Sequence, residues 1–137
     1  MRFMIIRKAD PKTEAGAMPT EELIDAMGKY HEDLVKAGVL LDGAGLKPSA
    51  KGARVLFSGG KPTVLDGPFA ETKELIAGYS IIEVRSKEEA IEWVRRWPPI
   101  DGDGNVAIEI RPLYELDDFG PSEGIERMKE LGIGRKG

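Results

Sequence analysis

Two capped helical segments, each set between strand-like segments, constrain the fold of this chain more than any other feature. The first is predicted to begin after Thr20, whose hydroxyl suits an N-cap, and to end before Gly38, a typical residue beyond a helix C-terminus. Its apolar residues recur at four- and three-residue steps and predict one buried stripe, formed by Leu23, Met27, Tyr30, Leu34 and Ala37. The second opens with the capping box of Ser86 and Glu89 and is predicted to end at Trp97, because two prolines follow.

Strand-like segments surround these helices. They are predicted at residues 2–8, 39–46, 77–85 and 106–111, and a hairpin is predicted to join 54–57 to 62–65. The hairpin turn contains Gly59 and Gly60, which tolerate positive φ. The order strand, helix, strand, hairpin, strand, helix, strand matches the βαββαβ ferredoxin-like plan of the α+β class, with an inserted β-hairpin.

The first strand is predicted to be apolar on both faces, with Phe3 and Ile5 pointing one way and Met4 and Ile6 the other, so we expect both faces to be buried. In a fold of this kind the helices cover only one face of the sheet. A homodimer that packs sheet against sheet would bury the second face and enclose a cleft.

The last strand alternates between apolar and polar residues. Val106, Ile108 and Ile110 are predicted to face the helices, which places Glu109 and Arg111 on the opposite face. These two charged residues are therefore candidates to contact a ligand in the cleft of the dimer.

The composition excludes several function classes. The length of 137 residues suits one domain, and a net charge of −4, with bases scattered among acids, argues against a nucleic-acid partner. No apolar run approaches the roughly 18 residues of a membrane span, so no membrane partner is expected. The absence of cysteine removes disulfides, thiolate nucleophiles and Cys-ligated metals, and it fits a cytoplasmic location.

The composition changes at Tyr114, where an acidic segment begins. We therefore expect a domain at 1–113 and a C-terminal extension at 114–137. The extension is predicted to contain a short helix at 122–131 and frayed residues at 134–137.

The segment 66–74, Asp-Gly-Pro-Phe-Ala-Glu-Thr-Lys-Glu, combines a sharp turn with the densest set of reactive side chains in the chain. Gly67 tolerates positive φ, and Pro68 fixes its own φ and disfavours helix at Gly67. The segment has two interpretations. It is either a structural corner, in which Phe69 fills the core, or a site in which Asp66 and Glu71 move protons while Lys73 binds an anion.

Other candidate sites carry weaker signals. His31 is the only histidine and lies at the edge of the helical stripe, so it is either a boundary residue or a general base. The turn that begins at Asp101 resembles the start of a calcium loop, but Val106 and Pro112 occupy the positions where that loop requires glycine and glutamate. Trp93 and Trp97 lie four residues apart and are predicted to be core residues. No metal and no cofactor are predicted.

The segment 66–74 resembles the signature of the DGPF-domain proteins, which belong to the YCII-related superfamily. The resemblance extends from the first strand to about Pro112 and includes five further matching positions, at Gly38, Gly43, Leu46, Gly78 and Trp93. It implies a ferredoxin-like, dimeric α+β barrel with a cleft between the sheet and the helices of each subunit.

The resemblance does not transfer the catalytic pair proposed for YCII-like relatives. Those relatives have a histidine on the first helix and an aspartate before the proline that ends the second. In this chain the two positions fall near Met27 and at Trp97, and His31 lies one helical turn away from the first. Some DGPF relatives are encoded beside, or fused to, extracytoplasmic-function sigma factors, which implies an accessory or regulatory role.

Two functions follow as hypotheses. The first is a homodimer that binds a small polar molecule in a cleft beside the segment 66–74, with cofactor-independent acid–base catalysis as a further step. Its candidate catalytic residues are Asp66, Glu71, Lys73 and His31, and its candidate ligand contacts are Phe69, Glu74, Glu109 and Arg111. The alternative is a non-catalytic accessory protein that acts with a partner such as a sigma factor, which the acidic segment 117–119 favours.

Overall fold

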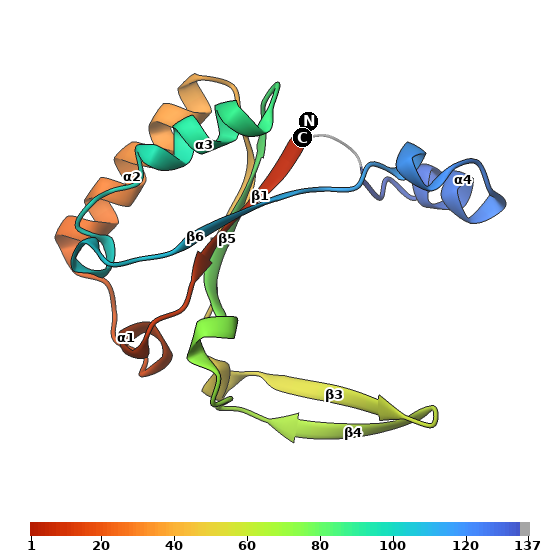
Figure 1. Cartoon of the computed structure of the whole chain (residues 1–137), viewed down its shortest axis with the longest axis horizontal. Coiled ribbons are helices and arrows are strands. Elements are labelled where there is room, and N and C mark those ends of the chain that lie inside the picture. The colour runs from red at the N-terminus through yellow and green to blue at the C-terminus, as the bar shows by residue number, and fades with distance from the viewer. Residues whose placement is uncertain (135–137) are drawn as a thin grey trace.

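The computed structural model describes residues 1–134 of the chain (Figure 1). Its strands are β1 (Arg2–Lys8), β2 (Leu40–Gly45), β3 (Ala53–Ser58), β4 (Lys61–Asp66), β5 (Ile76–Glu83) and β6 (Ile108–Pro112). Its α-helices are α1 (Pro11–Glu14), α2 (Glu21–Lys36), α3 (Lys87–Arg95) and α4 (Glu123–Glu130). Short 3-10 turns are η1 (Ser49–Lys51), η2 (Thr72–Glu74), η3 (Asp101–Gly104) and η4 (Leu116–Phe119).

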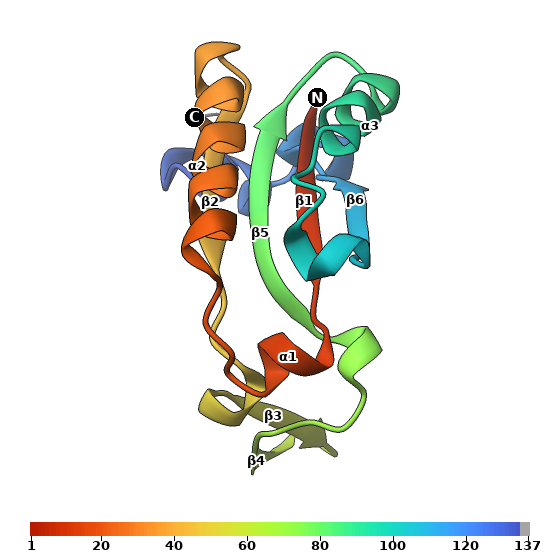
Figure 2. The same ribbon diagram turned by 90° about the vertical axis from the view of Figure 1, so that its left-hand side faces the viewer.

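Four strands form one antiparallel sheet in the order β2-β5-β1-β6, while β3 and β4 form a separate hairpin. Without the hairpin, this is the strand order of the ferredoxin-like fold, so the predicted fold class is confirmed. The helices α2 and α3 lie on the same face of the sheet (Figures 1 and 2). Each helix crosses one strand of the sheet: α2 connects β1 to β2 with β5 between them, and α3 connects β5 to β6 with β1 between them.

The core lies between this sheet and the two helices. From the sheet, Phe3 and Ile5 of β1 and Ile82 of β5 are almost fully buried, and Leu34 of α2 packs with them. Met4 and Ile6 point to the other face and are only half-buried, since no helix covers it. Within the single chain, one face of the first strand is buried as predicted, and burial of the other face in a homodimer remains a prediction.

Tyr30 closes the same core with a polar contact. Its hydroxyl donates a hydrogen bond of 2.8 Å to the backbone oxygen of Trp93, and burial raises the pKa of Tyr30 to about 12. Trp93 and Trp97 both pack against the core cluster, as predicted.

The helix boundaries follow local capping with three differences. Thr20 and Ser86 cap α2 and α3 as predicted. Ala37 is the exposed C-cap of α2 rather than part of the buried stripe, because the helix ends one residue before it. The helix α3 ends at Arg95, two residues before the predicted end at Trp97. The segment that begins at Asp10, for which no helix is predicted, contains the short helix α1, which a capping box opens.

Two segments project from the sheet on the side away from α2 and α3 (Figure 1). One is the β3–β4 hairpin, whose turn residues Gly59 and Gly60 have positive φ as predicted. The other follows β6 and contains α4, which Ser122 caps at its N-terminus. The division of the chain at residue 113 remains a prediction. Apart from Gly134, the predicted frayed end falls outside the described residues. Within residues 1–134, no helix is long and apolar enough to cross a membrane.

Candidate functional site

The loop after β4 packs closely against the connection between β2 and β3. The Gly67 N–H donates a hydrogen bond of 3.1 Å to the backbone oxygen of Gly52. A Cβ atom at position 67 would lie 1.8 Å from the backbone oxygen of Ser49. Position 67 therefore requires glycine because two backbone segments approach each other here, although its φ is not positive. The Gly67-Pro68 peptide bond is cis.

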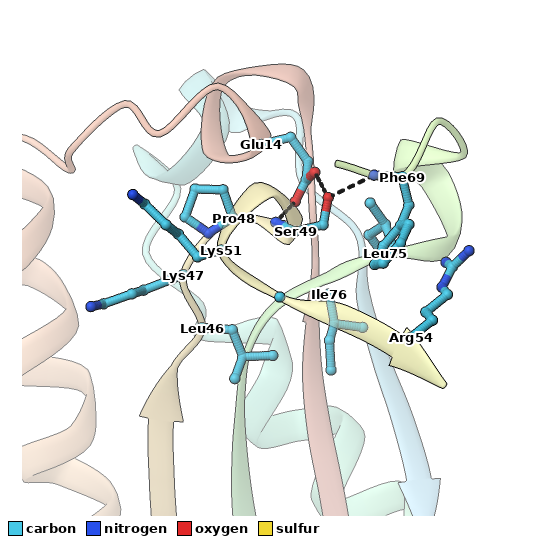
Figure 3. A pocket seen from close by; sticks show the side chains of 11 residues that line it. Glu14, Leu46, Lys47, Pro48, Ser49, Lys51, Arg54, Phe69, Leu75 and Ile76 are labelled. Atoms are coloured by element: carbon cyan, nitrogen blue, oxygen red, sulfur yellow. Dashed lines mark hydrogen bonds between the residues drawn. The ribbon is translucent and has the colours of Figure 1, made fainter. Parts of the chain in front are cut away.

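Ser49 links this loop to helix α1 (Figure 3). Its hydroxyl oxygen accepts a hydrogen bond of 3.0 Å from the Phe69 N–H, and its O–H donates one of 2.5 Å to Glu14 Oε2. The Ser49 N–H donates to Glu14 Oε1 at 3.0 Å. Three segments that are distant in sequence are thus held together at one serine. Neither Ser49 nor Glu14 was identified from the sequence, because no local motif marks a bond between residues 35 positions apart.

A cavity of about 350 Å³ lies beside this network, open to solvent. It is lined by residues from α1, the β2–β3 connection, β3 and the segment 69–76: Glu14, Leu46, Lys47, Pro48, Ser49, Lys51, Gly52, Arg54, Phe69, Leu75 and Ile76. Figure 3 shows Lys47 and Lys51 on one side of its apolar residues and Arg54 on the other. A small molecule with both apolar and charged parts matches these walls.

The loop 66–74 contributes one side chain to the cavity. Phe69 is half-buried, and the Arg54 guanidinium lies 3.8 Å from the centre of its ring. This stacking places a cation and an aromatic face at the same wall of the cavity. Phe69 was a predicted ligand contact, whereas Arg54 was not singled out in the sequence.

The charged residues of the loop point elsewhere. Asp66, Glu71, Lys73 and Glu74 are exposed and do not line the cavity. Within residues 1–134, none of their side chains forms a hydrogen bond or an ion pair. They are available to solvent or to a bound molecule that extends beyond the cavity.

The structure does not bring the remaining predicted site residues to the loop. His31 lies within α2, where its Nδ1 donates a hydrogen bond of 2.7 Å to the Met27 backbone oxygen. Glu109 and Arg111 lie on the open face of the sheet, as predicted, and bind each other at 3.3 Å. Their strand β6 is at the opposite edge of the sheet from β2, which leads into the cavity. Catalytic or ligand-binding roles for these three residues remain predictions.

A second polar cluster is buried between the sheet and the turn η3. Arg7 donates hydrogen bonds of 2.7 and 3.2 Å to the two carboxylate oxygens of Asp101, and Trp97 Nε1 donates to the same carboxylate at 2.9 Å. Asp10 forms a second ion pair with Arg7 at 3.1 Å. Residues 101–104 form a turn as predicted. The buried carboxylate of Asp101 attaches this turn to Arg7 of β1. Within the described part of the chain, no group of three or more His, Asp or Glu residues is placed to hold a metal.

Three comparisons describe what the chain resembles. A family model described as the YCII-related domain matches residues 1–116. An uncharacterized protein of Rhizobium meliloti (strain 1021) is 33% identical over 93 residues, which cover 68% of this chain and 74% of that protein. Among solved structures, a 5-chloro-2-hydroxyhydroquinone dehydrochlorinase from Burkholderia phenoliruptrix AC1100, in complex with 2,5-dihydroxybenzoquinone, has a TM-score of 0.48 and 19% identity. That match covers 84% of this chain and 95% of the other.

Proposed function

Because this chain belongs to the YCII-related domain family, we propose that it is a cytoplasmic protein that binds a small polar molecule in the cavity beside the loop 66–74. The observation that carries the proposal is that Phe69 of the loop and its anchor Ser49 both line this cavity. The loop is thus part of a wall built from three distant segments.

Binding is the first step of the proposal, and acid–base catalysis is the second. Asp66, Glu71 and Lys73 lie on the same loop as Phe69, and Leu75, which lines the cavity, directly follows η2. A bound molecule that extends past Phe69 would meet these exposed groups. His31 would take part only if the molecule also reached α2.

A thermal-shift screen of the purified protein against a metabolite library tests the binding step. A compound present at a hundred times its dissociation constant stabilises the folded state by about 2.7 kcal/mol. Phe69→Leu should weaken the binding of such a compound, since it removes the ring on which Arg54 stacks. Phe119→Leu is the matched control, because Phe119 is exposed and lies outside the cavity.

Two results would contradict the proposal. One is that no compound in a broad library stabilises the protein. The other is that hits bind equally well to the wild type and to Phe69→Leu. Loss of turnover in Lys73→Ala with unchanged affinity would instead support catalysis by the loop.

We also propose that the protein is a homodimer, because the open face of the sheet carries half-buried apolar side chains. These are Met4, Ile6, Tyr79 and Ile81. Apolar surface of this kind is commonly buried between subunits. A charge at its centre should then separate the subunits.

Light scattering of Ile81→Glu tests the dimer. The wild type should have twice the mass of the chain and the variant the mass of one chain. Ile24→Glu is the matched control, since Ile24 is an exposed residue of α2, on the other side of the sheet. A monomeric wild type, or a dimeric Ile81→Glu, would overturn the dimer proposal.

The second candidate function is a non-catalytic accessory role with a protein partner such as a sigma factor. The favouring observation is the segment after β6, which exposes Tyr114, Phe119, Leu131 and Ile133. Its start is held to the sheet by a bidentate pair between Arg2 and Glu115, at 2.9 Å for both bonds. Binding of a purified sigma factor, with no hit in the metabolite screen, would favour this function over the first.

A further inference from the structure

The lining of the cavity has a net positive charge. Its lining contains three cations, Lys47, Lys51 and Arg54, and one carboxylate, Glu14. Both oxygens of Glu14 accept hydrogen bonds from Ser49, so this carboxylate is already engaged. On a chain with a net charge of −4, the lining is a local reversal of sign.

The three cations have no anionic partner in the described part of the chain. Lys47 and Lys51 form no hydrogen bond or ion pair among residues 1–134, and within the same residues Arg54 stacks on Phe69 without an ion pair. Stacking occupies the face of the guanidinium and leaves the N–H groups at its edge available to an acceptor. By contrast, Lys29, Lys36 and Lys129 of the helices each bind a nearby carboxylate.

The space between the cations is apolar. Leu46 and Ile76 lie between the two lysines and Arg54, and Phe69 and Leu75 lie beside Arg54 (Figure 3). A hydrated inorganic ion would leave these side chains uncovered. An apolar group in contact with them would gain roughly 25 cal/mol for each Å² of surface removed from water.

We propose that the cavity binds an organic anion, a carboxylate or phosphate monoester, whose apolar body covers Leu46, Leu75 and Ile76 and whose charged group meets the edge of Arg54. This inference rests on the proposed function, since it concerns the same cavity. The volume of about 350 Å³ is at the small end of ligand pockets, which favours an anion with a compact body. A neutral polar molecule of equal shape would leave the cations without a partner and should bind less tightly.

Calorimetric titrations with pairs of acids and their amides test this ligand class. The probes are 3-phenylpropionate with 3-phenylpropanamide, hexanoate with hexanamide, and inorganic phosphate as an anion without an apolar body. Phenyl phosphate represents the monoesters. We expect the organic anions to bind about tenfold more tightly than the amides or inorganic phosphate, and high salt to reduce the difference.

Arg54→Gln should remove most of the preference for acids, because glutamine keeps a planar group near Phe69 but carries no charge. Lys61→Gln is the matched control from the same hairpin, since Lys61 lies in β4 outside the cavity. The inference is overturned if amides bind as tightly as acids, or if Arg54→Gln keeps the full preference.

An error in the ligand class and an error in the proposed function give different results. If none of these probes binds but neutral compounds from the metabolite library do, with loss in Phe69→Leu, the cavity is the site and the ligand class is wrong. If no compound of any charge binds, both the ligand class and the proposed function are wrong.

Discussion

Replacing Asp101 with asparagine should destabilise the fold by about 3 kcal/mol, the lower end of the range for breaking a buried ion pair. The Asp101 side chain is only 7% exposed, and it binds Arg7 and Trp97 together. An amide cannot neutralise the buried guanidinium, although Asp10 still accompanies it. Urea-induced unfolding measures this loss. Asp103→Asn is the matched control and should change stability little, because its ion pair with Lys12 is exposed.

The same cluster predicts a loss of stability in acid. Burial opposes ionisation of Asp101, but hydrogen bonds from Arg7 and Trp97 outweigh it and hold the pKa below its ordinary value of 3.8. A depressed pKa contributes stability that is present above the ordinary value and is lost as the pH falls through the folded one. The difference between the wild type and Asp101→Asn should therefore be complete at pH 6 and shrink below about pH 4. A difference that stays constant down to pH 2 would contradict the role of this ion pair.

Gly67→Ala should disrupt the candidate site. The new Cβ would lie 1.8 Å from the Ser49 oxygen and 2.6 Å from its carbonyl carbon, and both are backbone atoms that cannot rotate away. The loop must therefore move, which breaks the bonds to Gly52 and Ser49. We expect a loss of roughly 1–3 kcal/mol, as for other overpacked sites, together with the loss of ligand binding.

Gly45→Ala is the matched control for this substitution. A Cβ at Gly45 would have no atom within 4 Å, although the residue lies directly before the cavity residue Leu46. Thermal unfolding and titration of a hit from the metabolite screen measure both effects. Wild-type affinity in Gly67→Ala would show that the close approach of the loop to Ser49 does not shape the site.

The parts of the fold that were predicted correctly depend on short stretches of sequence. Thr20 and Ser86 cap helices through bonds to residues three positions later, and the two glycines of the hairpin act within their own turn. Signals of this kind are local, so the order of elements and the ferredoxin-like plan could be inferred. The end of α3 at Arg95 was misplaced because the final turn tightens before the prolines, which the sequence pattern does not reveal.

The features that were missed depend on contacts between distant segments. The requirement for Gly67 comes from the backbone of Ser49, and the role of Asp101 comes from Arg7, 94 positions away. Likewise, the cations of the cavity are assembled from the β2–β3 connection and from β3. The sequence predicts a site formed by the charged residues of the loop. In the structure, it is Phe69 of that loop that lies in the wall of the cavity.

NMR mapping of a bound ligand tests the proposed position of the site most directly. It uses a hit from the metabolite screen and ¹⁵N-labelled protein. We expect the largest changes in amide chemical shift at Ser49, Arg54 and Phe69, with α2 and β6 little affected. Shifts concentrated around His31 on α2, or around Glu109 on the open face of the sheet, with Ser49 and Phe69 unchanged, would place the ligand elsewhere. That result would contradict binding in the cavity beside the loop 66–74.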